Sequence, residues 1–265
     1  MKKIYLIALL IIAAFLVPTG VFAKTYGGEF DASSKDPNSN PYTMVWVYDE
    51  NSKSLVISGY GALREFNNKY DQPWYEYSSQ VENLIIEEGI TSIGKREFIG
   101  MESLKSVSIP NTVNFISMRA FQDCTSLEEV TIPSNVGTIQ DMAFIGCTSL
   151  KKVVFEQGVK NIGVYMFGDI PTLEDVYVYG ENTVISRMRS NQDDGTWFRG
   201  MTDFSKLTVH CVKGSNADKY FTEDIYTITN WANDSSGEEA TQKFEKKPNY
   251  MTDGKYKLHV EYISE

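Results

Sequence analysis

The stretch F-Q-D-C-T-S-L-E-E-V-T-I-P-S-N-V-G-T-I, from Phe121 to Ile139, decides the fold, because its apolar pattern recurs every 23 residues. Four of its positions form ladders along the sequence: Phe98, Phe121, Phe144 and Phe167; Leu104, Leu127, Leu150 and Leu173; Val107, Val130, Val153 and Val176; and Ile93, Ile116, Ile139, Ile162 and Ile185. Four ladders that stay in step over this length indicate a repeat architecture.

Each repeat predicts one strand followed by a turn. Val130 and Ile132 are two residues apart and therefore share one face of a strand. Pro133 comes next and cannot donate a hydrogen bond to a continuing ladder, so the chain turns there. The A-F-x-x-C-x-S-L stretch returns on the far side as a short helical turn or irregular segment. A single repeat cannot bury its apolar side chains, but stacked repeats bury them against one another. We therefore predict an α/β repeat solenoid with a parallel β-sheet on one face.

A fifth unit is interrupted. Phe198, Phe204, Leu207 and Val209 repeat the spacing found from Phe98 onward, but eight extra residues stand within Ser186 to Trp197. Insertions of this kind become loops on one face of a solenoid and sometimes bind ligands. This insertion loop is therefore one candidate binding element.

The pattern A-F-x-x-C-T-S-L-x-x-V-x-I-P resembles the BspA-like (Treponema-type) leucine-rich-repeat family of bacterial surface proteins. The resemblance runs from about Gly27 to Tyr220. It departs from the family pattern at the insertion and at four single positions, which are Met101 and Ile170 in place of Cys, and Glu97 and Met166 in place of Ala. Family membership implies a leucine-rich-repeat fold and a secreted or surface-exposed protein, with adhesion or host-protein binding in some members, and it does not fix a ligand.

The array needs caps at both ends. Residues 24–80 are predicted as an N-terminal β cap with a hairpin over residues 43–58, and residues 81–228 as the leucine-rich-repeat solenoid. Residues 229–265 are predicted as a linker, from Asn233 to Lys247, and a C-terminal strand or tail. The strand pattern runs from Lys255 to Ile263, and its pairing partner is not evident from the sequence.

Residues 1–23 read as a cleavable signal peptide. Lys2 and Lys3 precede an apolar run that is shorter than the roughly 20 residues of a membrane span, and V-F-A ends in a cleavage pattern after Ala23. An uncleaved N-terminal anchor is the alternative. We therefore expect a secreted or cell-surface protein with no membrane insertion after cleavage.

The charge argues against nucleic acid as a partner. The chain carries 25 basic and 35 acidic residues, a net charge of −10. Removal of two lysines with the signal peptide gives 23 − 35 = −12. An acidic surface repels phosphate backbones and anionic lipid headgroups.

The sequence does not predict an enzyme. Only His210 and His259 are present, and no catalytic motif, metal-ligand spacing or cofactor motif accompanies them. His210 lies between inward Val209 and Cys211, so we expect it to face outward and to be solvated. The run from Asn191 to Gly195 is interpreted as a solvated turn because it lacks the spacing of a calcium loop. We expect no catalytic residues, no metal and no cofactor.

The cysteines are expected in the core. Cys124 and Cys147 occupy the same place in adjacent repeats, which favours two stacked, reduced thiols, and the alternative is a disulfide across neighbouring rungs. Cys211 should face the same interior.

The candidate site is the outward face of the sheet. Alternation places Val154, Tyr177 and Tyr179 on it as one apolar-aromatic patch, and the insertion loop adds Trp197. Tyrosine is enriched where proteins bind ligands, although it is also common in strands for structural reasons.

The expected function is extracellular or cell-surface binding or adhesion to a protein or glycan. The alternative is a non-catalytic envelope scaffold or self-assembling surface protein. The oligomeric state is not predicted.

Overall fold

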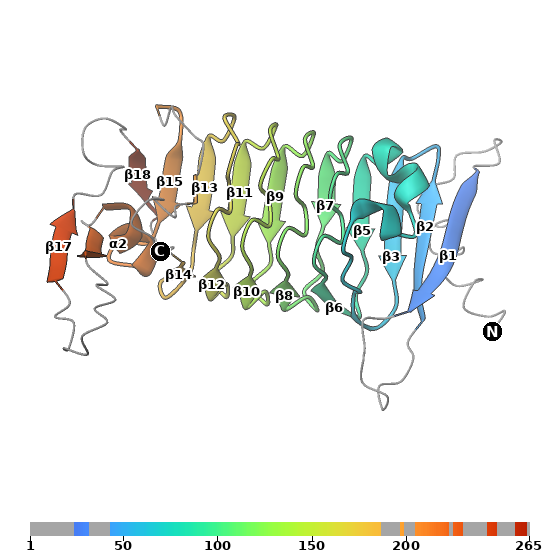
Figure 1. Ribbon diagram of the computed structural model, residues 1–265, viewed down its shortest axis with the longest axis horizontal. Helices are drawn as coiled ribbons and strands as arrows, with labels where there is room; N and C mark the ends of the chain where they lie inside the picture. Colours follow the sequence, from blue (N-terminus) through green and yellow to red (C-terminus); the bar gives the residue numbers. More distant parts are fainter. Residues whose placement is uncertain are drawn as a thin grey trace, which may run out of the picture.

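The computed structural model describes residues 24–31, 43–186, 197–198, 205–222, 225–229, 243–247 and 258–263. Figure 1 shows an elongated solenoid whose strands lie side by side from β1 at one end toward β18 at the other. The first wall of parallel strands contains β3 (Ser54–Ser58), β5 (Asn83–Ile86), β7 (Ser106–Ser108), β9 (Glu129–Ile132), β11 (Lys152–Phe155), β13 (Asp175–Val178), β15 (Thr208–Cys211) and β18 (His259–Tyr262). Its hydrogen-bonded sheet is interrupted between β7 and β9.

A second wall of short parallel strands follows the turns. It contains β4 (Gly61–Ala62), β6 (Ile90–Ile93), β8 (Phe115–Ile116), β10 (Thr138–Ile139), β12 (Asn161–Ile162) and β14 (Val184–Ile185). The ladders of the sequence are in register in both walls, with Val130 beside Val153 and Val176, and with Ile116 beside Ile139, Ile162 and Ile185. These pairings confirm the predicted 23-residue solenoid, and the second wall adds to the single sheet that we expected.

The third side of each coil is also hydrogen-bonded from rung to rung. The Phe98 amide donates to the Ala120 carbonyl at 2.8 Å, and the Phe121 amide donates to the Ala143 carbonyl at 2.9 Å. Two positions per repeat have positive φ near this segment: Arg96, Arg119, Met142 and Tyr165; and Gly100, Asp123, Gly146 and Asp169. Left-handed backbone costs a non-glycine residue about 1–2 kcal/mol, and the rung-to-rung bonds offset that strain.

Stacked rings run through the middle of the solenoid. Trp74, Phe98, Phe121 and Phe144 are fully buried, with neighbouring ring centroids 5.6, 5.5 and 5.3 Å apart. The Leu, Val and Ile ladders surround this stack in one continuous hydrophobic core.

The N-terminal cap is a β-hairpin extended by one strand. Strand β1 (Thr25–Asp31) pairs antiparallel with β2 (Thr43–Asp49), and β2 pairs antiparallel with β3. Strand β3 then pairs parallel with β5, so the parallel wall begins inside residues 24–80. The short 3-10 helices η1 (Lys69–Asp71) and η2 (Tyr75–Gln80) follow.

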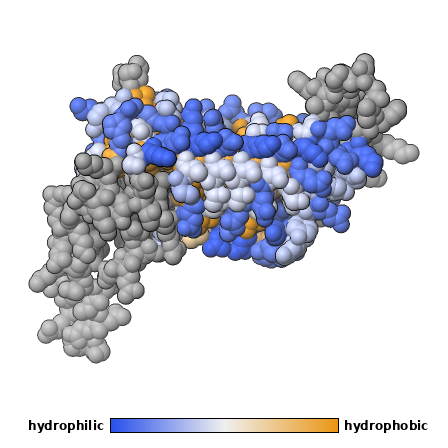
Figure 2. Space-filling view, turned by 90° about the horizontal axis from the view of Figure 1, so that it is seen from above, coloured by the Kyte–Doolittle hydropathy of each residue, from blue (hydrophilic) through white to orange (hydrophobic). Residues whose placement is uncertain are grey.

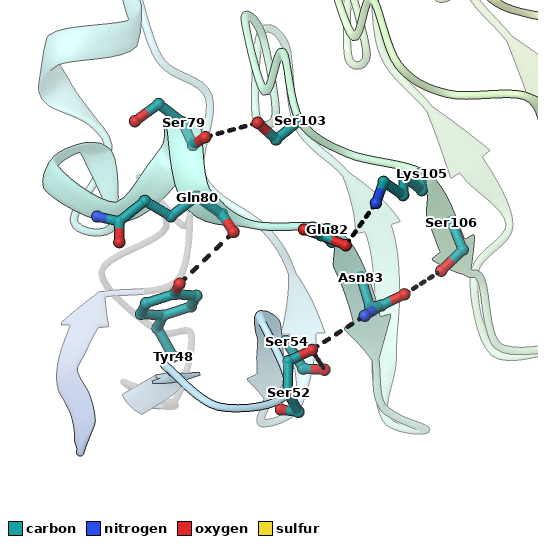
Figure 3. Close-up of polar contacts among 10 residues, drawn as sticks. All are labelled: Tyr48, Ser52, Ser54, Ser79, Gln80, Glu82, Asn83, Ser103, Lys105 and Ser106. Carbon is teal, nitrogen blue, oxygen red and sulfur yellow. Dashed lines mark hydrogen bonds and ion pairs between the residues drawn. The ribbon is translucent and has the colours of Figure 1, made fainter. Parts of the chain in front are cut away.

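Polar contacts tie this cap to the first repeats (Figure 3). The Tyr48 hydroxyl lies 3.5 Å from the Gln80 carbonyl, and the side-chain amide of Asn83 donates to the Ser52 carbonyl at 3.1 Å. One rung further, Lys105 and Glu82 form an ion pair at 2.7 Å. The cap therefore continues the solenoid rather than forming a separate unit.

The last repeat has a different register from the one we predicted. Phe198 stacks on Phe167 at 5.9 Å, which agrees with eight inserted residues before it. However, Val209 pairs with Val176, and Cys211 pairs with Val178. Val209 therefore continues the Val107 ladder, whereas its distance of 11 residues from Phe198, the same as from Phe98 to Ile109, predicted the position of Ile109. The cause is two further residues between Phe198 and Val209, since the spacing from Phe167 to Val176 is 9 and this one is 11.

The C-terminal strand closes the first wall. Helix α2 (Asn216–Thr222) follows β15, and β16 (Ile225–Thr229) pairs antiparallel with β17 (Lys243–Lys247). Strand β17 lies in the region predicted as a linker. Strand β18 returns and pairs parallel with β15, with Val260 beside Val209. This pairing supplies the partner that the sequence did not reveal.

Among the residues that the structure describes, no helix has the length and apolar character needed to cross a bilayer. The predicted signal peptide, residues 1–23, lies outside the described residues.

Candidate binding face

The outer face of the first wall changes character along the solenoid. On β7 and β9 it presents small or polar side chains that are exposed, namely Ser106, Ser108, Glu129 and Thr131. On β11, β13 and β15 it presents longer, half-buried side chains: Lys152, Val154, Asp175, Tyr177 and His210. The C-terminal half of this face therefore carries the larger and more varied contact groups.

Tyr177 lies at the centre of this half. Val154 is its neighbour on β11, and Tyr179 is two residues further on, with ring centroids 6.2 Å apart and planes within 14°. The Lys152 ammonium lies 5.5 Å from the centre of the Tyr177 ring, within cation–π range. The structure thus brings together three predicted site residues, Val154, Tyr177 and Tyr179, and Tyr179 is exposed.

His210 is held by two carboxylates. Its Nε2 lies 2.7 Å from Asp175 Oδ1 on one neighbouring strand, and its Nδ1 lies 3.3 Å from Glu261 Oε2 on the other. Glu261 also lies 3.2 Å from His259 Nε2. The predicted outward orientation of His210 is confirmed, but the predicted solvation is wrong, since only 14% of the side chain is exposed. Tyr177 and the acids on both sides cover it.

Trp197 is not a surface residue, and its assignment to a binding loop is wrong. It is fully buried, and its ring meets Phe167 edge-on at 5.5 Å. The Phe167 amide donates to the Trp197 carbonyl at 2.7 Å, in the place of the bond from Phe121 to Ala143. Trp197 therefore occupies the repeat's Ala position in the core. Residues 187–196 of the insertion, with the predicted turn from Asn191 to Gly195, lie outside the described residues.

An open pocket of about 630 Å³ adjoins Tyr179. Ser134, Glu156, Gln157, Tyr179, Glu181, Val212 and Ile263 line it. These residues follow the ends of β9, β11, β13, β15 and β18, so the pocket runs across five neighbouring rungs. Sequence reasoning missed it because its lining residues belong to turns that carry no ladder pattern.

The cysteines are buried free thiols. The Cys124 and Cys147 thiols donate to the Phe98 and Phe121 carbonyls at 3.3 and 3.2 Å. Burial raises the pKa of Cys124 well above its ordinary value. Burial, with the nearby Asp218 carboxylate, raises the pKa of Cys211 to about 11. The protonated thiols of Cys124 and Cys211 are poor nucleophiles and poor metal ligands. Within the described ranges, no cluster of three or more His, Cys, Asp or Glu side chains is placed to hold a metal ion.

The visible surface offers no broad apolar patch. Figure 2 shows the solenoid from above, and hydrophilic and intermediate residues dominate this face, with only small hydrophobic spots.

Comparison with one solved structure, from Eubacterium ventriosum, supports the fold. A leucine-rich repeat protein from Eubacterium ventriosum is 19% identical, covers 78% of this chain and 47% of its own, and superposes with a TM-score of 0.54. One from Bacteroides ovatus is 28% identical, with 42% and 31% covered and a TM-score of 0.36. The T. pallidum leucine-rich repeat protein is 21% identical, with 53% and 77% covered and a TM-score of 0.39. This chain thus spans about half or less of the first two proteins.

No curated protein matches the chain. The family model for the BspA type leucine rich repeat region matches residues 71–189 in six copies. Those residues contain the four ladders and the strands that they form. Residues 71–189 of the chain therefore form a BspA-type leucine-rich repeat region.

Proposed function

We propose that this protein is a non-catalytic binding or adhesion module, secreted or held at the cell surface, that attaches to a protein or glycan ligand. The observation that carries the proposal is the cluster of Val154, Tyr177 and Tyr179 on the outer face of the first wall. Tyrosine rings give large contact areas at low entropic cost because they have few rotatable bonds. Placement outside the cell rests on the signal-peptide pattern of residues 1–23 and on the family of the repeats.

The neighbouring groups support recognition of a polar ligand. Lys152, Asp175 and Tyr179 place a cation, an anion and a phenol around the Tyr177 ring. The acidic net charge disfavours nucleic acid and anionic membranes as partners. The same residues on a rigid, hydrogen-bonded wall need little reorganisation on binding.

The test is binding of the purified protein to an array of host matrix proteins, mucins and glycans. A saturable ligand that weakens on Tyr179→Ala and Tyr177→Ala, but not on Thr131→Ala of the same face, supports the proposal. A ligand that is indifferent to the tyrosine changes moves the site elsewhere. No binding at all by a folded sample argues against the binding function.

A scaffold or self-assembling surface protein is the second candidate. Strand β18 is an edge strand of the first wall, and 51% of Tyr262 on it is exposed. Exposed edges pair readily with other chains. Concentration-dependent association that disappears on deletion of residues 248–265 supports this role, and a monomer at all concentrations opposes it.

A further inference from the structure

We infer that the pocket beside Tyr179 is a groove for an extended basic peptide, with the cationic side chain at one end and an apolar side chain at the other. This inference rests on the proposed binding function and names the class of ligand.

The chemical character of the lining changes along the solenoid. Glu156 and Gln157 follow β11, Tyr179 and Glu181 follow β13, and Val212 and Ile263 follow β15 and β18. One end is therefore acidic, the middle combines a carboxylate with an aromatic ring, and the other end is aliphatic. A carboxylate pair beside a tyrosine ring suits an ammonium or guanidinium group, which gains from both charge attraction and cation–π contact.

The floor of the groove is closed to strand addition. The amide groups of Glu156, Tyr179 and Ile263 already donate to carbonyls of the preceding rung at 3.1, 3.1 and 3.0 Å. The Ser134 amide donates to Glu156 Oε2 at 2.9 Å and orients that carboxylate. At these three positions a ligand therefore meets side chains rather than free amide groups, so recognition there depends on the ligand's own side chains.

The dimensions fit a short peptide. Five neighbouring parallel strands span roughly 19 Å at about 4.8 Å per spacing, which is the length of about six extended residues. The acidic rung and the first aliphatic rung are two spacings apart, or roughly 10 Å. A basic residue about three positions from an aliphatic residue matches this separation. A neutral glycan would leave the two carboxylates without a charge partner.

The experiment measures fluorescence anisotropy of the purified protein with labelled six-residue peptides that carry a lysine three residues before a leucine. We expect saturable binding that weakens as salt rises, because the pocket is open to solvent and ions can screen its charges. The double variant Glu156→Gln/Glu181→Gln should lose about tenfold in affinity, as expected for two ion pairs in a pocket open to solvent. The matched control Glu88→Gln/Glu102→Gln removes the same charge outside the groove and should stay within about twofold of the parent.

The aliphatic end is tested separately. Ile263→Ser should weaken the lysine–leucine peptide and leave a lysine–glycine peptide of the same length unchanged. Equal losses in the groove and control double variants would show unspecific charge attraction and overturn the inference. Stronger competition by a glucosamine oligosaccharide would assign the groove to a cationic glycan instead.

The array experiment distinguishes the two proposals. If an array ligand binds but no peptide does, the peptide groove is wrong and the binding function stands. If neither binds, the binding function itself fails.

Discussion

The Tyr177 ring lies flat on the His210 imidazole, with centroids 4.1 Å apart and planes within 4°. Each nitrogen of that imidazole faces a carboxylate, one from β13 and one from β18. The contact joins three strands, and the strand furthest along the chain is held by it. His210 therefore links the aromatic face to the strand that closes the wall.

Replacing His210 with Ala should loosen β18. Glu261 would lose its neighbour on β15, whereas the inner rungs would keep theirs. Hydrogen exchange measured by mass spectrometry should quicken in residues 258–263 and stay unchanged in β9 and β11. The control is His259→Ala, because that side chain is 65% exposed and touches Glu261 from the other side. Equal effects of the two changes would contradict the role of His210.

Glu97→Met should stabilise the protein at neutral pH. Burial raises the pKa of Glu97 well above its ordinary value of 4.5, with nearby Arg64 opposing the shift. A carboxyl whose folded-state pKa is raised binds more protons when folded, so its contribution to stability falls as pH rises above about 4.5. Met166 stands at the equivalent position. Urea unfolding should show a gain of roughly 1–3 kcal/mol at pH 7.

The pH dependence provides the control for this change. The gain should shrink toward pH 4, where Glu97 is protonated in both states. Glu102→Met at an exposed site should show neither effect. A gain that is independent of pH would point to packing alone.

Phe121→Ala should cost about 3–5 kcal/mol of unfolding free energy. The ring lies between Phe98 at 5.5 Å and Phe144 at 5.3 Å, so its removal opens a cavity in the middle of the stack. Phe121→Leu keeps most of the volume and should cost less. Chemical denaturation measures both, and a loss below about 1 kcal/mol for the alanine variant would show that the stack collapses around the gap.

Replacement by alanine should change the stability of the protein in opposite directions at two glycines that do not have positive φ. An added Cβ at Gly158 would overlap the Ser134 backbone carbonyl, whereas at Gly137 the nearest atom is the Asn114 carbonyl oxygen at 3.7 Å. Gly158→Ala should therefore destabilise the protein. Gly137→Ala should stabilise it by about 0.4–1 kcal/mol through the unfolded chain. Thermal unfolding of the two variants side by side tests the difference in sign.

The three thiols should be unreactive in the folded protein. All are buried, and the Cys211 pKa of about 11 leaves little thiolate at pH 8. Titration with a thiol reagent should detect none of them before denaturant is added and all three afterwards. Rapid reaction of one thiol under native conditions would mean that the core opens locally around it.

The regular repeats could be predicted from the sequence because each side chain packs against the side chain at the equivalent position of the next repeat. A fixed spacing of 23 therefore sets the pairing of Val130 with Val153 directly. The method failed where the spacing changed. Trp197 and Phe198 stand where Ala and Phe stand in other repeats. The position of Trp197 directly before Phe198 therefore indicates a core residue rather than a residue of the insertion loop.

The surroundings of His210 could not have been predicted. Part of its cover comes from Glu261, which lies 51 residues away in sequence on a strand with no repeat pattern. The pocket could not be predicted for a related reason. Its lining residues come together because they lie in neighbouring turns, and the sequence of these turns varies from repeat to repeat.

The place of β18 in the wall has a consequence for synthesis. His259 leaves the ribosome 48 residues after Cys211, which at 5–20 residues per second is a delay of roughly 2–10 s. During that interval β15, with Val209 and Cys211 on its inner side, is paired with β13 on one edge and is not yet covered by β18 on the other. The partly synthesised solenoid is therefore prone to aggregate at the uncovered edge of β15 until β18 has been synthesised and pairs with it. Chaperones or export factors would have their greatest effect during this interval.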